Sequence, residues 1–217
     1  MQKDMNRQDS FFSLLSEVDQ SRLLKSSQEK NYGKGEVIFS KGEPGTHVWV
    51  VRKGRVHLQN VSFDGRVLTS CVMTTGDVFC CLPALDSKAY PSDAIAVEKS
   101  TVVKIPGALF REVLAANKNF SQSVLCSFCD RLRDAESKGC HAYDPAEIRI
   151  ARVLLTLSKK FNNEIPLTRQ EMSEIAGLTI ETTIRTLSQM KKDGIIGSSR
   201  RMTRILNVQK LSSLIDE

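Results

Sequence analysis

The side chains with the clearest chemical use lie near the carboxyl end of the chain, in the segment 179–192. Arg185 can make a bidentate pair with guanine, Glu181 can accept a hydrogen bond from the amino group of cytosine, and Ile180 can contact the methyl group of thymine. Helical spacing puts these residues on one side of a helix, opposite an apolar stripe. This set is typical of a helix that reads base edges, and it favours DNA binding over an ordinary helical hairpin with solvated charges.

The residues around this helix supply the signals that would fold and place it. Thr168 and Glu171 have the spacing of a capping box at the start of a first helix, and Gly177 can end that helix in the left-handed conformation. Thr179 is then the expected N-cap of the second helix, after a short turn. Together these signals predict a helix-turn-helix over residues 168–192. Phosphate contacts at its margins are expected from Arg169, Lys191 and Lys192.

A basic hairpin is predicted after the second helix. Two β-prone stretches enclose Arg200, Arg201 and Arg204, which is the pattern of a wing that lies along a DNA backbone. From Pro145 onward, 12 Lys and Arg residues stand against 8 Asp and Glu, so this part holds +4 of the formal net charge of +6. The basic excess therefore lies where a polyanion is expected to bind.

The composition is that of a globular chain with two modest domains. Its 217 residues are 41% hydrophobic and 26% charged. No apolar run approaches the length of a membrane span, and the polar start MQKDMNRQDS lacks the features of a secretory signal. We therefore expect a cytoplasmic protein with reduced cysteines and no membrane partner. Paired catalytic carboxylates, a nucleotide-binding loop and a nucleophile elbow are also missing from the sequence, so we expect no enzymatic activity.

The first half of the chain is predicted to begin with a helix and to continue with β-strands. Residues Phe11 to Ser27 read as a short helix with an apolar face that includes Phe12. The stretch 31–104 then holds short β-prone runs broken by glycines. Three of these glycines are spaced by 11 residues, the rhythm of strand, turn and strand, and they are Gly54, Gly65 and Gly76. This stretch predicts a β sandwich or barrel.

A long apolar stripe follows the β-rich part. Its members recur every three or four residues on one helical face, and they are Leu109, Val113, Ala116, Phe120, Val124, Phe128, Leu132 and Ala135. The stripe is too long to be hidden against a small β domain alone, so it predicts a parallel pairing with the same helix of a second copy and a twofold dimer. Residues 138–145 then read as a hinge, and Pro145 stands at the start of a new helix.

Four motifs, taken with this order of elements, give the chain a resemblance to the superfamily of the cAMP receptor protein and the fumarate-nitrate reductase regulator, the CRP/FNR superfamily. They are KGEVIFSKGEPG, VVRKGRV and TTGDVF in the β-rich part and TRQEMSEIAGLTIETTIR in the helix-turn-helix. The resemblance implies an α+β fold with a cyclic-nucleotide-binding-like β-roll over 1–107, a dimerisation helix over 108–139 and a winged helix-turn-helix domain over 140–217. It also implies a bacterial, allosteric transcription regulator that binds a pseudo-palindromic operator in double-stranded DNA as a homodimer and works with RNA polymerase.

The resemblance also assigns roles to residues of the DNA-reading motif. Glu181 and Arg185 stand at the main base-reading positions, and Ile180 replaces an arginine that cAMP regulators carry, which is closer to the oxygen-responsive branch. The residues from Thr168 to Gln170 stand at backbone-contacting positions. The full set expected to contact DNA is Thr168, Arg169, Gln170, Thr179, Ile180, Glu181, Thr182, Arg185, Arg200 and Arg201.

The sensor part departs from the cyclic-nucleotide pattern at the positions that hold the nucleotide. Where that pattern has a Gly-Glu pair for the ribose and an Arg-Ser pair for the phosphate, this chain has Cys80-Cys81 and Pro91-Ser92. A phosphate would lack its bidentate guanidinium partner there, so we expect cAMP and cGMP not to bind. The residues expected around a small-molecule or gas effector are Phe79, Cys80, Cys81, Pro91, Ser92, Leu132, Ala135 and Glu136.

The chemistry of the effector stays open between several alternatives. Cys80 stands where carbon monoxide sensing members carry a thiolate that ligates haem, although Leu82 replaces their neighbouring histidine. Cys126 and Cys129 form a C-x-x-C on a helix, which could act as a thiol redox switch or a metal site near a twofold axis. An organic small molecule and a pocket filled by side chains are further alternatives. Plain burial is the commonest fate of free cysteines.

Two other readings fit the residues less well. An oxygen-sensing iron-sulfur cluster needs a group of N-terminal cysteines, and none of the first 70 residues is Cys, so we do not expect one. Outside the family, a ligand-binding regulatory module without DNA binding would share the β-roll. Such a module would have no use for a base-reading helix and a basic wing.

Overall fold

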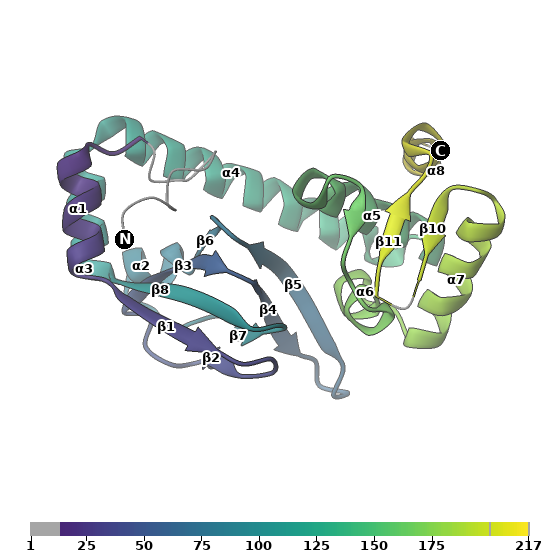
Figure 1. Cartoon of the computed structure of the whole chain (residues 1–217), viewed down its shortest axis with the longest axis horizontal. Coiled ribbons are helices and arrows are strands. Elements are labelled where there is room, and N and C mark those ends of the chain that lie inside the picture. The colour runs from purple at the N-terminus through teal and green to yellow at the C-terminus, as the bar shows by residue number, and fades with distance from the viewer. Residues whose placement is uncertain (1–13, 200, 217) are drawn as a thin grey trace. The chain divides into compact units, whose positions relative to one another are not determined.

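The computed structural model of the chain describes residues 14–199 and 201–216, and within these it does not describe the side chains of residues 134, 137–140, 142 and 216. The chain divides into two compact units (Figure 1). The first consists of Met1–Asn60 and Ser70–Arg133, and the second of Val61–Thr69 and Asp134–Glu217. Each unit is described by itself below. Arg200, and Phe11 and Phe12 of the expected first helix, lie outside the described residues.

The first unit, together with the hairpin end Val61–Thr69 that is grouped with the second, contains two four-stranded sheets, which confirms the expected β sandwich or barrel. The first sheet has the antiparallel order β1 (Gln28–Tyr32), β8 (Ser100–Pro106), β3 (His47–Lys53) and β6 (Val78–Phe79). The second has the order β2 (Val37–Phe39), β7 (Asp93–Ala96), β4 (Arg55–Val61) and β5 (Val67–Thr74). The three glycines spaced by 11 residues lie in the successive turns between β3 and β4, between β4 and β5, and between β5 and β6. All three have a positive φ. At Gly54 a Cβ would also meet Ser100 Oγ at 2.4 Å.

An aromatic cluster fills the space between the two sheets. Phe39 stacks on Tyr90 with ring centroids 3.9 Å apart, and Trp49 packs beside Phe39 and Phe79. The Trp49 indole donates a hydrogen bond to Tyr90 Oη at 3.0 Å, and Tyr90 Oη donates in turn to the carbonyl of His47. Because both polar groups have partners, their burial costs little. Trp49 is the single tryptophan of the chain, so its fluorescence reports on this core.

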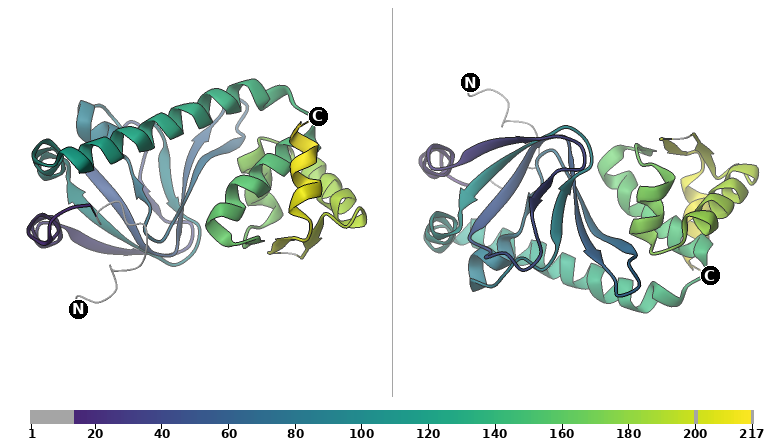
Figure 2. Two further views of the ribbon diagram at one scale, coloured as in Figure 1. Left: turned by 90° about the horizontal axis from the view of Figure 1, so that it is seen from above. Right: turned by 90° about the horizontal axis from the view of Figure 1, so that it is seen from below.

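Helices close one side of the sandwich. Helix α1 (Glu17–Lys25) packs against α3 (Gly107–Ala116), and α2 (Cys81–Asp86) packs against α3 and β3. Helix α4 (Lys118–Cys140) follows, and its first turns lie along the sandwich (Figure 2). The short α2 is absent from the sequence-based expectation, because six residues without a capping side chain give no periodic signal.

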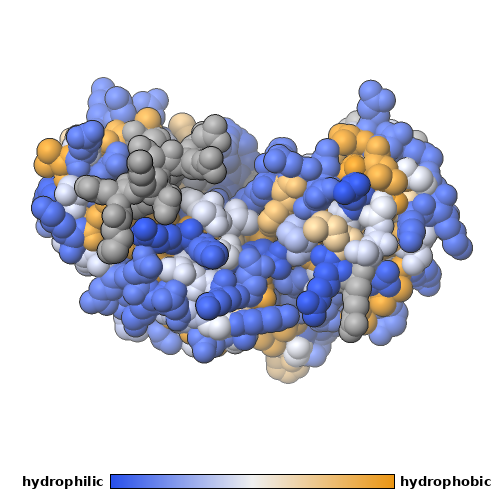
Figure 3. Space-filling view, in the orientation of Figure 1, coloured by the Kyte–Doolittle hydropathy of each residue, from blue (hydrophilic) through white to orange (hydrophobic). Residues whose placement is uncertain are grey.

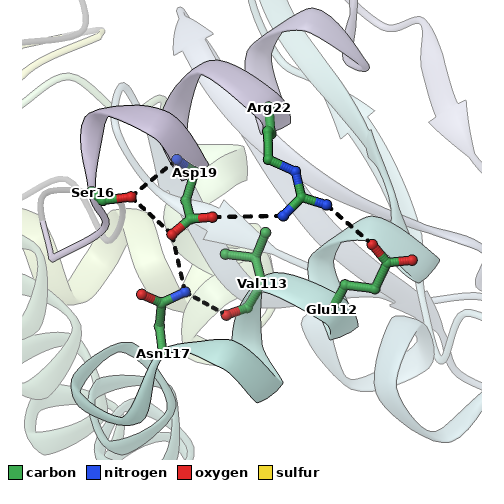
Figure 4. Close-up of polar contacts among 6 residues, drawn as sticks. All are labelled: Ser16, Asp19, Arg22, Glu112, Val113 and Asn117. Atoms are coloured by element: carbon green, nitrogen blue, oxygen red, sulfur yellow. Dashed lines mark hydrogen bonds and ion pairs between the residues drawn. The ribbon is translucent and has the colours of Figure 1, made fainter.

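The prediction of a continuous helix over residues 108–139 is wrong, because the helix is interrupted at Asn117. This residue has φ −123° and ψ 96°, outside the helical region. Its side-chain amide donates to the carbonyl of Val113 at 2.9 Å and to Asp19 Oδ2 at 3.2 Å (Figure 4). Arg22 of α1 also lies 3.3 Å from Glu112. A residue that bonds its own backbone in this way competes with the helix, and the polar contacts with α1 then fix the bend.

The long apolar stripe also divides between two environments. Phe120 and Val124 are buried in a core cluster that also holds residues of α2, α3, β3, β6 and β8, and Phe128 packs partly on that core. Leu132 is 60% exposed, and so is Leu125, at 62%, which the stripe did not include. The prediction that the whole stripe needs a second copy is therefore wrong for Phe120, Val124 and Phe128. The helical period alone does not indicate that these three residues pack in the core of their own chain.

The second unit contains a helical core and a three-stranded sheet. A 3₁₀ turn at His141–Tyr143 leads to α5 (Ala146–Phe161), with Pro145 before its first residue as expected. Then come β9 (Glu164–Ile165), α6 (Arg169–Ala176), α7 (Ile180–Lys192), β10 (Ile196–Ser198), β11 (Thr203–Ile205) and α8 (Val208–Asp216). The sheet has the antiparallel order β10, β11, β9. The expected hairpin wing is thus confirmed, and α8 was not predicted.

The surface agrees with the patterning of these elements. In the view of Figure 3 it is mainly hydrophilic, and apolar residues gather in smaller patches. Among the described residues, none of the helices combines the length and the apolar character that a membrane crossing requires.

Candidate functional site

The first helix of the motif is fixed at both ends by the residues that the sequence singled out. Thr168 Oγ1 accepts a hydrogen bond from the backbone N–H of Glu171 at 3.1 Å, and the Glu171 carboxylate accepts from the N–H of Thr168 at 2.6 Å. This reciprocal pair is the predicted capping box. Gly177 ends the helix with φ 63° and ψ 34°, the left-handed conformation that favours glycine. The predicted helix-turn-helix is confirmed.

The second helix, α7, presents a polar face because its other face is held in the core. Thr179 Oγ1 accepts from the N–H of Thr182 at 3.2 Å and so caps the helix. Thr183, Leu187 and Met190 are only 0%, 2% and 0% exposed. Glu181, Arg185 and Ser188 are therefore turned to solvent, while Ile180 and Thr182 are half-buried. A rigid helix with these groups outward can offer a guanidinium, a carboxylate and hydroxyls to base edges.

The other residues expected to contact DNA differ in their exposure to solvent. Gln170 is exposed and donates to Glu174 Oε1 at 2.8 Å. Thr168 and Arg169 are half-buried at the start of α6, and Arg201 is exposed beside the wing tip. The sequence-based expectation that Arg204 lies between the two strands of the hairpin is wrong. Arg204 is in β11 and forms an ion pair with Glu164 of β9, so the hairpin is shorter than expected.

Arg149 is a positioning residue that sequence reasoning missed. It lies on α5, and its Nη2 donates to the carbonyl of Gly177 at 2.9 Å, which ties the turn of the motif to the domain core. Its partner is 28 residues away, so no local pattern could have indicated it. Glu174 on α6 is also half-buried, and burial raises the pKa of its carboxyl group, with a smaller contribution from Glu171.

Substitution of the turn glycine should uncouple the two helices. An alanine at position 177 would have to adopt φ 63°, and its Cβ would lie 2.6 Å from Arg149 Nη2. We expect Gly177→Ala to lower the free energy of unfolding by at least about 1 kcal/mol, measured by chemical denaturation. Gly197→Ala is the matched control, because its Cβ would meet only Leu206, at 3.9 Å. Equal effects of the two substitutions would contradict the role of this turn.

The residues expected around the effector differ in their burial. Phe79, Cys80, Cys81 and Ser92 are buried in the first unit. Cys80 packs with the aromatic cluster, whereas Cys81 packs with the core under α3 and α4. Pro91 is exposed. The three helical members of the set are also exposed, namely Leu132, Ala135 and Glu136.

A second unpredicted residue, Arg131, reaches from α4 toward these cysteines. Its Nη2 donates to the carbonyl of Val78 at 2.9 Å. Burial raises the pKa of the Cys80 thiol and of the Cys81 thiol to about 12, and the positive charge of Arg131 offsets only part of this effect. Both thiols are therefore neutral at physiological pH, as packed core residues.

This burial should separate the cysteines by reactivity. With a pKa of about 12, roughly one in ten thousand of the Cys80 and Cys81 thiols is ionised at pH 8. We expect brief treatment with iodoacetamide at pH 8 to modify the exposed Cys126 and to leave Cys80 and Cys81 unmodified. Peptide mass spectrometry measures this, and unfolded protein, in which all cysteines react, is the control. Labelling of Cys80 as fast as Cys126 in folded protein would contradict the burial argument.

The cysteines whose side chains the structure describes do not form a recognisable metal site. Within the described part of the chain, no group of three or more His, Cys, Asp and Glu side chains is placed to hold a metal ion. Cys126 and Cys129 lie exposed on α4. A two-cysteine site would need ligands from elsewhere to complete four-coordinate zinc.

Comparisons with known proteins agree with both units. A cyclic nucleotide-binding domain model matches residues 29–117, and a Crp-like helix-turn-helix domain model matches residues 148–214. The CRP-like cAMP-activated global transcriptional regulator of Mycobacterium tuberculosis is 23% identical over 199 residues, which cover 88% of this chain and 89% of that protein. The fumarate and nitrate reduction regulatory protein of Salmonella typhi is 25% identical over 201 residues, which cover 86% and 78%.

The solved structures lead to the same family. FixK2 from Bradyrhizobium japonicum superposes with a TM-score of 0.78 at 26% identity, over 87% of this chain and 96% of that one. The curated relatives are transcription regulators rather than enzymes. A β sandwich that matches a cyclic nucleotide-binding domain is here followed by a capped helix-turn-helix with a wing. The chain therefore belongs to the CRP/FNR superfamily of DNA-binding transcription regulators.

Proposed function

We propose that two copies of this chain bind a pseudo-palindromic operator in the bacterial cytoplasm and regulate transcription together with RNA polymerase. The observation that carries the proposal is the outward face of α7, where Glu181, Arg185 and Ser188 are exposed on a helix whose opposite face is buried. A twofold dimer would present two such helices about one DNA turn apart. Arg201 on the wing would add phosphate contacts.

The proposed division of labour follows the order of the elements. Residues 1–107 would sense the effector, residues 108–139 would join the two copies, and residues 140–217 would bind DNA. The effector would act by favouring one arrangement of these parts, and the available free energy is its difference in affinity between the arrangements. The contacts of α4 with the sandwich, through Phe120, Val124 and Arg131, give the sensor a physical connection to the dimerisation helix.

We further propose that the effector is not cAMP. Two neutral thiols, Cys80 and Cys81, occupy the place of the ribose-binding pair, and both are packed into core clusters. The nearby guanidinium, that of Arg131, already donates to a backbone carbonyl. We expect calorimetric titration with cAMP to give no binding heat up to millimolar nucleotide. The Mycobacterium tuberculosis relative named as cAMP-activated is the positive control, and micromolar affinity in this chain would overturn the proposal.

The DNA-binding proposal is tested by selecting operators from a pool of random duplexes with the purified full-length protein. We expect an inverted repeat with half-sites about 10 base pairs apart, centre to centre. Affinity for it should fall with added salt, with a logarithmic slope of about −0.9 for each phosphate neutralised. Recovery of no sequence preference, or of a single half-site without symmetry, would contradict the proposed dimeric reader.

A further inference from the structure

Helix α4 carries a row of exposed residues on the side away from the sandwich. The row runs through Gln122, Leu125, Cys129, Leu132 and Glu136, spaced by three, four, three and four residues. We call it the outer row. Leu125 and Leu132 are large apolar side chains with more than half of their surface exposed, and Cys129 lies between them. Spacing of this kind is that of the seam residues of a two-stranded coiled coil.

The occupant that fits the outer row is the same row of a second copy. The opposite side of α4, with Phe120 and Val124, is already buried in its own chain, so a partner helix must pack on the exposed side, which carries the large apolar residues Leu125 and Leu132. A parallel, twofold pairing places each residue of the row against its own copy, which buries Leu125 and Leu132 together. This step rests on the homodimer of the proposed function. It moves the seam from the sequence-based stripe to the exposed residues.

Such a pairing brings one cysteine, and not the other, within disulfide range of its copy. Packed helices are about 8–10 Å apart between axes, and Cα atoms lie about 2.3 Å from the axis. Seam Cα atoms are then about 3–5 Å apart, and at the wider spacings they meet the window of about 4.4–6.8 Å for a disulfide. Cys126 is turned about 60° from Cys129 around the helix. That rotation carries its Cα away from the twofold axis, to about 7–9 Å from its copy.

A disulfide within one helix is disfavoured by the same geometry. Residues three apart on a helix have Cβ atoms about 5–6 Å apart, whereas a disulfide needs about 3.5–4.5 Å. The two cysteines of the C-x-x-C therefore have different prospects. In such a pair, Cys126 would lie on the flank and Cys129 would face its own copy.

We infer that Cys129 is the site of a disulfide between the two subunits of the dimer, formed by oxidants of the peroxide class. One Cys129 thiolate attacks hydrogen peroxide, which yields a sulfenic acid and one water after protonation. The Cys129 thiol of the second copy then attacks this sulfur, the S–S bond forms, and the sulfenic hydroxyl leaves as a second water. Two thiols are oxidised and one peroxide is reduced to two waters. The product is a covalent dimer joined at the middle of α4.

Non-reducing gel electrophoresis of the full-length protein after hydrogen peroxide treatment tests this inference. We expect a covalent dimer in the wild type and in Cys126→Ser, and complete loss of it in Cys129→Ser. Cys126→Ser is the matched control, because it removes another exposed thiol of the same helix, about one turn away. Cross-linking that survives Cys129→Ser, or that is lost in Cys126→Ser, would overturn the assignment.

Sedimentation of the reduced protein separates failure of this inference from failure of the proposed function. A reduced dimer without any peroxide-induced cross-link would refute the disulfide and leave the DNA-binding homodimer standing. A reduced protein that is monomeric, and remains so on operator DNA, would refute both. A dimer that cross-links through Cys129 supports both, and it places the outer row at the twofold axis.

Discussion

Replacement of Arg185 by alanine should cause the largest loss of operator binding of any single exposed substitution in α7. A bidentate contact between arginine and guanine is worth about 1–3 kcal/mol of discrimination, which is about 5- to 140-fold for each copy. In a dimer both copies lose the contact, so the total is about 2–6 kcal/mol. Because Arg185 is exposed on a helix held by buried Thr183 and Leu187, the fold should not change. Fluorescence anisotropy with the selected operator measures the loss.

The matched control is Lys191→Ala, which removes an exposed cation near the end of the same helix. If Lys191 holds a phosphate, its loss should weaken binding to all sequences by a similar factor and reduce the salt slope by about one per copy. Arg185→Ala should instead spare binding to random DNA and relax preference at one position of each half-site. The same fractional loss on operator and random duplexes would show that Arg185 contacts only the backbone.

The helix-turn-helix could be predicted because its signals are local. Thr168 and Glu171 complete a capping box three residues apart, and Gly177 and Thr179 stop one helix and start the next. Each of these interactions closes within four residues, so the sequence contains both partners side by side. The outward face of α7 then follows from which residues are apolar. The β sandwich was predictable for a similar reason, because its turns need glycines with positive φ at regular spacing.

The parts that could not be predicted depend on partners far away in the chain. Arg149 reaches Gly177, and Arg131 reaches Val78, across 28 and 53 residues. The break at Asn117 is stabilised by Asp19, across 98 residues. Helical periodicity gave the apolar members of the long helix but not the direction in which they face, because that direction is set by the bend. The effector residues were inferred from positions alone, and the structure separates the buried ones from the exposed ones.

Opposite sides of α4 should therefore respond differently to truncation. Phe120 is fully buried, with its ring at the edge of Phe110 and centroids 5.9 Å apart, so Phe120→Ala should lower the free energy of unfolding of the first unit by about 3–5 kcal/mol. Leu132→Ala removes an exposed side chain and should change that free energy by no more than about 0.5 kcal/mol. Both values can be measured by urea unfolding followed through the fluorescence of Trp49, which lies in the same unit. The protein concentration should be below the dissociation constant of the dimer.

The dimer should show the reverse order, which makes the pair of variants decisive for the position of the seam. Leu132→Ala should shift the sedimentation equilibrium toward monomer, because each dimer loses two apolar side chains from its interface. Phe120→Ala, at temperatures where it remains folded, should dimerise like the wild type. If Leu132→Ala dimerises normally and Phe120→Ala does not, the second copy binds on the side that this structure assigns to the core. The sequence-based stripe through Phe120, Val124 and Phe128 would then be the interface after all.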